Sequence, residues 1–415
     1  MDASRRSAQR ICIVGGGIGG LTLHIALRAR GIDSVIFEQA RELTEIGAAV
    51  ALSANGTRLL TRLGLGPELA AVSTEPSELI FRSWKDARRL GAHPVGKDGV
   101  YRREFGGPYF GMHRKHLQQI LLKACDLGCI RFGHRLTGLR AERDSVQLEF
   151  SNGVTERATL VVGADGIRSA VRKHLTGRDD TIYSGTTGFR GLVARERLPK
   201  LPDPEAIQFW MGPGAHLLHY GIGNKAEYIN ILAVVEGPRR WPNDERRRDD
   251  VFGEDIVQRF AAWHPAAREL SEVLAQREGW GMFAVRPLRR WSQGPIVLLG
   301  DAAHGMLPHQ GQGANQTIED AVTLAGILAK PPAESVEECL LAYENLRKPR
   351  TRRVQQYSWR ANRQLHLMDG PAARQRDLRL QSLPEAVRWI HEHDAEPGPS
   401  SPLGFSMRSR LSSLT

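Results

Sequence analysis

Short apolar runs that end in glycine-rich turns recur along the chain, and each leads into a stretch with helical periodicity. Residues 11–14 are uniformly apolar, and residues 34–37 form a second run of the same kind. Runs of this length favour strands buried on both faces, as in a parallel sheet. Between them, Leu21, Ile25 and Ala26 lie on one face of a helix. The N-terminal segment therefore predicts a strand–helix–strand unit.

The turn after the first strand carries glycines in the order G-x-G-x-x-G. They are Gly15, Gly17 and Gly20. This spacing lets the backbone approach a pyrophosphate closely, and the amides that open the next helix attract the anion. Glu38 ends the second strand, where an acid roughly 20 residues after the glycines accepts a hydrogen bond from a ribose hydroxyl. The segment predicts a dinucleotide site, with an ordinary glycine turn as the alternative.

A second glycine turn follows the apolar run at residues 296–299. Gly300 and Asp301 come directly after this run, and a helical pattern begins after the residues Gly311, Gly313 and Asn315. A carboxylate at the carboxyl end of a strand can accept a hydrogen bond from a sugar hydroxyl, and unpaired helix amides favour an anionic ring or phosphate. This turn predicts a second part of the same cofactor site.

A third strand is predicted at residues 160–162, and the Asp165-Gly166 turn and a basic helix start with Arg168 and Arg172 follow it. Alone, this Asp-Gly pair indicates an ordinary turn. In order, however, the three segments resemble the single-component FAD-dependent aromatic hydroxylases, the class A flavoprotein monooxygenases. The resemblance is to the branch with salicylate, 3-hydroxybenzoate and 6-hydroxynicotinate hydroxylases, and it covers about residues 10–357.

The resemblance implies an α/β fold, α+β overall, with a Rossmann-like FAD-binding domain of the glutathione-reductase type, an antiparallel-sheet substrate domain and C-terminal helices. It also assigns FAD to positions of this chain. The cofactor-binding residues so implied are Gly15, Gly17, Gly20, Glu38, Ala49, Arg114, Leu136, Asp165, Gly300, Asp301, Gly311, Gly313 and Asn315. Ala49 replaces the last glycine of a G-A-G run that passes beside the isoalloxazine, which narrows the room at the ring.

The candidate catalytic residues are two histidines and a tyrosine. His216 and Tyr220 share one face of a predicted strand, and related hydroxylases carry this pair beside the substrate; a half-exposed histidine and a packed tyrosine are the alternative. His309 follows Pro308 in the loop that the family places across the flavin. A neutral imidazole there could deprotonate a phenol.

The implied reaction is hydroxylation of a small phenolic acid, such as a hydroxybenzoate or aminohydroxybenzoate. In the family, NADH or NADPH reduces FAD, and the reduced flavin and O₂ form a C4a-hydroperoxyflavin that oxygenates the ring. Arg190 could anchor the substrate carboxylate or form a surface salt bridge, and Arg168 and Arg172 could contact NAD(P)H. Two alternatives are a flavoprotein of the same fold that epoxidises or otherwise oxidises, and a flavin-binding regulatory or polyanion-binding protein.

Composition limits these alternatives. The 415 residues are 41% hydrophobic and 25% charged, enough for more than one folding unit. The net charge of +11 comes from dispersed arginines without interleaved aromatics, so we expect no nucleic-acid partner. The 4 cysteines are too scattered for a disulfide framework, and we expect no metal site. Without a long apolar run or a signal segment, we expect a cytoplasmic monomer or homodimer that binds no membrane.

The three cofactor segments are far apart in the sequence, so the FAD-binding domain must be discontinuous. We expect it to comprise residues 8–75, 105–180 and 282–365. The substrate domain then comprises residues 76–104 and 181–281, and residues 366–415 form a C-terminal helical segment and a mobile tail.

Overall fold

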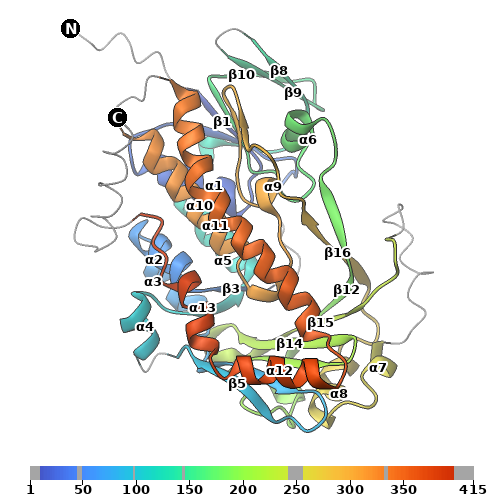
Figure 1. Ribbon diagram of the computed structural model, residues 1–415. Coiled ribbons are helices and arrows are strands. Elements are labelled where there is room, and N and C mark those ends of the chain that lie inside the picture. Colours follow the sequence, from blue (N-terminus) through green and yellow to red (C-terminus); the bar gives the residue numbers. More distant parts are fainter. Residues whose placement is uncertain are drawn as a thin grey trace, which may run out of the picture.

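The computed structural model describes residues 10–43, 49–96, 99–142, 145–241, 256–330 and 335–396. Within them, a parallel sheet and a larger antiparallel sheet occupy opposite ends of the molecule, and long helices run between the two ends (Figure 1). The expected mixed fold is confirmed. Residues 47–48 of the G-A-G run and the expected tail after residue 396 lie outside the described residues.

The parallel sheet carries all three glycine turns at one edge. Its strand order is β17 (Ser292–Gln293), β18 (Ile296–Leu298), β11 (Leu160–Gly163), β1 (Ile11–Val14), β2 (Ser34–Phe37) and β7 (Ile130–Arg131). β1 pairs in parallel with β2 and with β11, and β11 pairs in parallel with β18. The short edge strand β17 is antiparallel to β18. The carboxyl ends of β1, β11 and β18 are therefore neighbours, which brings together turns that are far apart in the sequence.

Helices and a small sheet pack against these strands. α1 (Ile18–Arg28) contacts both α5 (Arg114–Ala124) and α10 (Gly313–Leu328). The small sheet consists of β8 (Leu136–Ala141), β9 (Val146–Phe150) and β10 (Thr155–Ala158). Phe150 of β9 stacks on Phe37 of β2 with ring centroids 4.7 Å apart, so the two sheets share one hydrophobic core.

The larger sheet is antiparallel except where β13 pairs in parallel with β4. Its order is β16 (Gly279–Val285), β12 (Thr181–Ala194), β15 (Tyr228–Glu236), β14 (Ala215–Ile222), β13 (Ile207–Gly212), β4 (Glu78–Ser83) and β5 (Arg89–Pro94). Because β16 belongs wholly to this sheet, the boundary expected after residue 281 falls inside a strand. Alternate residues face opposite ways: Leu217 packs toward α7 (Ile256–Arg259) and α8 (Pro265–Glu272), whereas Leu218 and Tyr220 face the other side.

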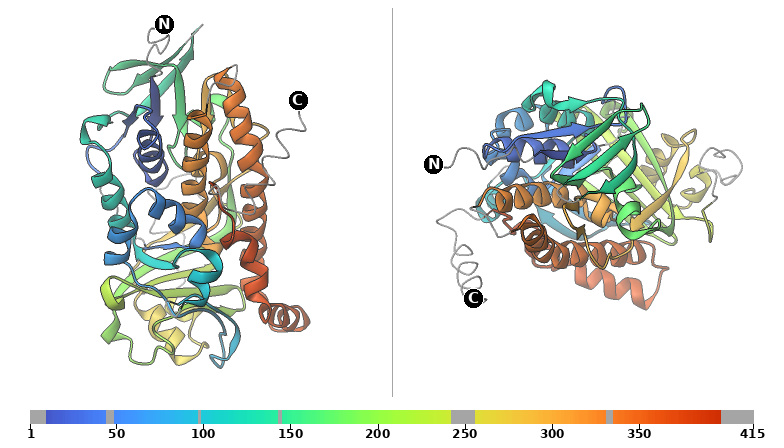
Figure 2. Two further views of the ribbon diagram at one scale, coloured as in Figure 1. Left: turned by 90° about the vertical axis from the view of Figure 1, so that its left-hand side faces the viewer. Right: turned by 90° about the horizontal axis from the view of Figure 1, so that it is seen from above.

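The helix α11 (Val336–Leu365) runs from the parallel-sheet end to the larger sheet, beside α10 (Figure 2). It includes the helical stretch expected near residues 343–360. α12 (Pro371–Leu380) and α13 (Leu383–His391) follow it and pack on β5. None of the described helices has both the length and the apolar character needed to cross a bilayer.

Short elements complete the space between the two ends. β3 (Ala49–Leu52) pairs with β6 (Phe110–His113) in an antiparallel ribbon. The other short elements are α2 (Ala54–Arg62), α3 (Gly66–Val72), α4 (Val100–Phe105), α6 (Ala170–Thr176), α9 (Asp301–His304) and the 3₁₀ turns η1 (Leu127–Cys129), η2 (Arg195–Arg197), η3 (Asn224–Ala226) and η4 (Pro308–Gln310).

Candidate functional site

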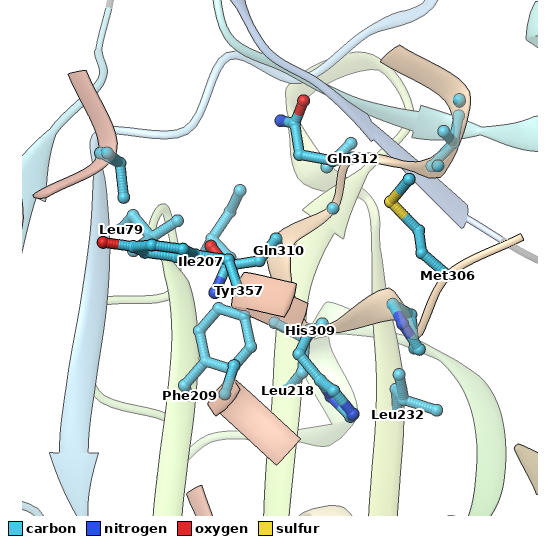
Figure 3. A pocket seen from close by; sticks show the side chains of 18 of the residues that line it. Leu79, Ile207, Phe209, Leu218, Leu232, Met306, His309, Gln310, Gln312 and Tyr357 are labelled. Atoms are coloured by element: carbon cyan, nitrogen blue, oxygen red, sulfur yellow. The ribbon is translucent and has the colours of Figure 1, made fainter. Parts of the chain in front are cut away.

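A cavity of about 590 Å³ lies between the glycine turns and the larger sheet. Its lining runs from Gly17 and Asp301 at the parallel-sheet edge, past Ala49, to Tyr220 and the helices α11 to α13. Figure 3 shows the part next to the larger sheet, where Leu79, Ile207 and Tyr357 line the cavity. The cavity therefore joins the expected cofactor segments to the expected substrate region.

In the first glycine turn, a side chain would have room at one glycine position and would clash with backbone atoms at two others. A Cβ on Gly15 would lie 2.4 Å from the carbonyl oxygen of Ala164, and one on Gly20 would lie 2.0 Å from that of Gly15. A Cβ on Gly17 would meet no atom within 4 Å. Gly17 also caps α1 without any side-chain hydrogen bond to the helix amides. The turn therefore leaves space for a phosphate at the N-terminus of α1, where backbone N–H groups can donate hydrogen bonds to it.

Glu38 stands beside this turn at the end of β2. Its two carboxylate oxygens accept hydrogen bonds from the backbone N–H groups of Gly16 at 2.7 Å and Ala40 at 2.8 Å. These bonds fix the direction of the side chain, and a carboxylate has further lone pairs for another donor. The arrangement is suited to a ribose hydroxyl.

In the second turn, Gly300-Asp301, the side chain of Thr317 lies close to the backbone of Gly300. Gly300 has φ +64°, and a Cβ there would lie 2.8 Å from the hydroxyl oxygen of Thr317, so only glycine fits without strain. Asp301 begins α9 and lines the cavity together with Gly311 and Gly313. The carboxylate and the amides at the start of α10 thus face one space.

Asn315 does not face that space. Its amide group donates to the carbonyl oxygens of Ala51 at 3.1 Å and Gly311 at 2.8 Å, and its oxygen accepts from the N–H of Ser53 at 3.1 Å. The side chain is fully buried. The expectation that Asn315 contacts the cofactor is therefore corrected for its side chain, which ties β3 to the glycine turn.

A buried ionic network that the sequence analysis missed supports the second turn. Asp320 accepts hydrogen bonds from the Gly300 N–H at 3.0 Å and from Arg347 at 2.7 Å, and lies 2.5 Å from His304 Nε2. Burial alone would raise the pKa of Asp320, but His304 and Arg347 outweigh it and hold the pKa below its usual range. Arg347 also pairs with Glu319 at 2.5 Å. Removing Arg347 would leave two buried carboxylates without this partner.

The third turn is a helix cap. Asp165 accepts hydrogen bonds from the Ser169 hydroxyl at 2.5 Å and from the Ala170 N–H at 2.7 Å. Its carboxylate therefore holds the start of α6, whereas its neighbours Ala164 and Gly166 line the cavity. The expectation of a direct cofactor contact is corrected from the Asp165 side chain to the backbone around it.

The two arginines after this turn differ. Arg168 is exposed, as a nucleotide contact requires. Arg172 is 1% exposed and donates to the carbonyl oxygens of Ala302 at 3.0 Å and Ile167 at 2.5 Å. The surface contact with NAD(P)H expected of Arg172 is wrong for this conformation, because the side chain joins the third turn to α9.

Three further residues were expected at the cofactor. Ala49, in β3, and Arg114, at the start of α5, both line the cavity. Leu136 begins β8, is half-buried and packs against the large core. It is not among the cavity residues described, which leaves its expected backbone contact untested.

At the substrate end, apolar side chains of the larger sheet line the cavity together with polar ones, among them Asn230. Figure 3 shows His309 between Leu218 and Leu232, with the ring of Phe209 nearby. Tyr220 also lines this part of the cavity and is 5% exposed. Burial raises the pKa of the Tyr220 phenol, although Arg190 counteracts this, so the hydroxyl stays protonated.

His309 is neutral in this environment. Burial, with a smaller contribution from His366, lowers the pKa of His309 to about 3. Both ring nitrogens lack a hydrogen-bond partner within the described residues. A neutral imidazole of this kind can accept a proton from a ligand hydroxyl at one nitrogen and donate from the other.

His216 lies behind His309, with ring centroids 5.1 Å apart, and is not among the cavity residues described. The expectation that it faces the substrate directly is therefore corrected. Arg190 is exposed, lines the cavity and stacks on Trp280 with its guanidinium carbon 4.7 Å from the ring centroid.

The comparisons agree with this geometry. The family model of the FAD binding domain matches residues 8–358. A 3-amino-4-hydroxybenzoate 2-monooxygenase of Streptomyces platensis is 37% identical over 94% of this chain and 97% of its own. A salicylate hydroxylase of Pseudomonas putida is 33% identical over 93% of each chain. A solved salicylate hydroxylase substrate complex superposes with a TM-score of 0.79 at 26% identity, over 94% of this chain and 96% of that one.

The glycine turns, the open space above Gly17 and the matches over nearly the whole chain lead to one conclusion. The residues present fit FAD, and the resemblance inferred from the three turns is confirmed. The chain belongs to the FAD binding domain family, within which it is an FAD-dependent aromatic hydroxylase.

Proposed function

We propose that this protein hydroxylates the ring of a small aromatic acid of the aminohydroxybenzoate type, with NADH or NADPH as reductant. The observation that carries the proposal is that two hydrogen-bonding groups, His309 and Tyr220, line the same cavity as the apolar side chains Phe209, Leu218 and Leu232. The rings of Phe209 and Tyr357 border this part of the cavity and can pack against an aromatic ring. The name of the 37% identical relative supports the choice of acid.

Bound FAD supplies reducing equivalents from NAD(P)H and the activated oxygen that reaches the ring. The glycine turns at Gly17 and Asp301 hold its phosphates and sugar hydroxyls, and Glu38 holds its ribose. The turn from Pro308 to Gly313 lies where the larger sheet, α10 and α11 meet, so a bound ring is shielded from water on several sides. Excluding water protects an activated oxygen from wasteful reaction.

The chain's own residues prepare the substrate. His309 Nε2 or Nδ1 accepts the phenolic proton, which makes the ring more electron-rich and so more reactive toward an electrophilic oxygen. Tyr220 donates a hydrogen bond from its protonated hydroxyl to the resulting oxyanion or to the ring substituent beside it. Arg190, at the edge of the cavity, pairs with the carboxylate. General-base help contributes at most about 10²–10⁴-fold in rate, and less for a base such as His309 whose pKa lies well below the working pH.

The test is oxidation of NADH and of NADPH by the FAD-loaded protein in the presence of 3-amino-4-hydroxybenzoate, salicylate and 3-hydroxybenzoate, with the mass of each product recorded. The proposal expects one acid to accelerate oxidation and to return one oxygen atom heavier, with that atom derived from ¹⁸O₂. Acceleration without a heavier product would mean that the acid only triggers reduction. No acceleration by any of the three acids would refute the substrate class.

We also propose a monomer or homodimer that works in the cytoplasm, where NADH and NADPH are supplied, without a nucleic-acid partner. The support is the dispersed arrangement of the basic residues. Light scattering at several concentrations tests the oligomeric state.

We further propose that the parallel sheet and its helices bind the cofactor and that the larger sheet binds the substrate. The boundary between these two domains then lies before β16 and not inside it.

A further inference from the structure

The C-terminal helices form one end of the cavity, where α12 and α13 pack on β5 (Figure 1). Arg360 and Gln364 lie one turn apart on α11, Arg376 and Arg379 lie three positions apart on α12, and all four line the cavity. Arg376 Nη1 donates to the Gln364 carbonyl oxygen at 3.0 Å, which joins the two helices. These residues follow residue 358, where the match to the family model ends. This part of the wall is therefore specific to the C-terminal segment.

The charged side chains that line the cavity are mostly positive. Among the described residues, Asp301 is the one carboxylate in the lining, and it belongs to the cofactor end. The arginines in the lining are Arg114, Arg190, Arg360, Arg376 and Arg379. Arg114 was expected at the cofactor and Arg190 lies on β12, so the other three stand together at the helical end. Positive charge gathered along one part of a cavity attracts anions to it.

The three arginines at the helical end differ in their partners. Arg376 is largely buried and donates from Nε and Nη2 to the Asp377 carboxylate at 2.9 and 2.8 Å, so its charge is balanced. Arg360 and Arg379 are exposed and also line the cavity, so the cavity reaches solvent beside them. Within the described ranges neither forms an ion pair, and Arg360 lies over the ring of Tyr357, with its guanidinium carbon 5.6 Å from the centroid. The charges of Arg360 and Arg379 are thus available to a ligand that enters here.

Two buried histidines line the same end of the cavity without adding charge. His93 of β5 and His391 of α13 stack with ring centroids 6.0 Å apart. Burial lowers the pKa of His93 to about 4 and that of His391 to about 3, so both rings are neutral. Both ring nitrogens of His93 and Nδ1 of His391 lack a hydrogen-bond partner within the described residues. Buried polar atoms are costly unless they bind something, and a neutral imidazole can bind a hydroxyl or amino group.

We propose that this end of the cavity is the entrance for the substrate, and that Arg360 and Arg379 select the carboxylate form of an aromatic acid as it enters. The carboxylate meets the two guanidinium groups first, and the ring then passes apolar side chains such as Leu383 on its way to His309. This inference rests on the proposed function, since it needs an anionic acid as the substrate. The two arginines act before the acid reaches His309, so they determine specificity and are not catalytic residues.

The test measures the rates at which an acid enters and leaves the site. The FAD-loaded full chain is mixed rapidly with 3-amino-4-hydroxybenzoate, without NADH or NADPH, and the change in flavin absorbance gives the association and dissociation rate constants. At low ionic strength, the double variant Arg360→Gln/Arg379→Gln should slow association about three- to tenfold. Dissociation should slow by a similar factor and leave Kd nearly unchanged, because an entrance affects the path in both directions and not the final complex. At 1 M salt, where the Debye length is about 3 Å, the difference should disappear.

Two controls isolate the charge at the entrance. Arg363 of α11 and Arg374 of α12 are exposed and are not among the cavity residues described. The double variant Arg363→Gln/Arg374→Gln removes the same net charge from the same two helices and should leave association nearly unchanged. The uncharged 3-amino-4-hydroxybenzamide should enter the Arg360→Gln/Arg379→Gln variant as fast as it enters the unmodified protein.

Equal slowing in the two double variants, or equal slowing for the acid and the amide, would overturn charge selection at the entrance. A weaker Kd caused by faster dissociation alone would also overturn it, because the arginines would then belong to the final binding site. If the acid associates at one rate with the unmodified protein and with both double variants, only the entrance is refuted. If the unmodified protein binds neither the acid nor the amide, the proposed substrate class is refuted and the entrance with it.

Discussion

The first glycine turn allows a matched pair of substitutions that separates cofactor binding from folding. Gly17→Ala adds a Cβ at a position where no protein atom lies within 4 Å, and the residue already has φ −75°, which alanine adopts freely. Gly20→Ala adds the same methyl group 2.0 Å from the carbonyl oxygen of Gly15. Both changes add one methyl group, and they lie three positions apart. The comparison therefore tests the effect of the space around the added methyl group.

The expected magnitudes follow from these contacts. Gly17→Ala should leave the free energy of unfolding of the apoprotein within about 1 kcal/mol of the original, since nothing is displaced and the unfolded chain loses some entropy. It should cost FAD about 1.5–3 kcal/mol by displacing a phosphate from the amides of α1, a loss of about 10- to 150-fold in Kd. Gly20→Ala should destabilise the apoprotein by about 1–3 kcal/mol or more, because the backbone of the turn must move.

Two assays measure the pair. Thermal or chemical denaturation of the apoprotein gives the stability of each variant, and quenching of flavin fluorescence on titration with apoprotein gives the Kd for FAD. The reasoning is refuted if Gly17→Ala binds FAD as tightly as the original protein, because the open space above Gly17 would then not be where the phosphate lies. It is equally refuted if Gly20→Ala is as stable as Gly17→Ala.

Arg347→Met should destabilise folding by about 3 kcal/mol, since it removes the cation shared by two buried carboxylates and leaves Glu319 with Arg350 and Asp320 with His304. Denaturation compared with the exposed-site control Arg352→Met measures this, and equal stability of the two variants would contradict it. His309→Gln should lower turnover by at most about 10²–10⁴-fold without changing the flavin spectrum, and unchanged turnover would remove His309 as the base. Burial lowers the pKa of His219 from 6.5 to about 3, so the stability that neutral His219 contributes is fully present above pH 6.5 and is lost as the pH falls toward 3. His219→Gln should therefore flatten the decline of unfolding free energy below pH 6.5 by about 1.4 kcal/mol per pH unit, measured by denaturation at stepped pH; an unaltered slope would count against a buried neutral histidine.

The cofactor end of the site could be predicted from the sequence because its chemistry is local. A strand, a glycine turn and a helix start are consecutive in the chain, and the parallel pairing of β1, β11 and β18 brings any such turns to the same edge. The side chains that share each face of β14 could also be predicted from the sequence, since neighbouring side chains on a strand must face opposite ways. These inferences needed no knowledge of which distant segments pack together.

Errors arose where one local pattern serves two purposes. An aspartate before a helix is favoured both as a cap and as a ligand for a sugar hydroxyl, and only the direction of the side chain distinguishes the two. Asp165 points to the Ala170 N–H and caps, whereas Asp301 lines the cavity. Likewise, an arginine near a turn can extend into solvent, as Arg168 does, or be buried against carbonyl oxygens, as Arg172 is.

The substrate end could not be completed from the sequence, because the properties of its residues come from long-range packing. The low pKa of His309 results from burial by β14, α10 and α11, and the partner of His216 is supplied from 150 positions away. No motif marks His366, which follows a helix in a segment that the sequence presents only as a C-terminal extension. Residues of this extension also line the cavity, among them Arg376 in α12 and His391 at the end of α13. The C-terminal segment therefore forms part of the wall of the site and is not an accessory to the fold.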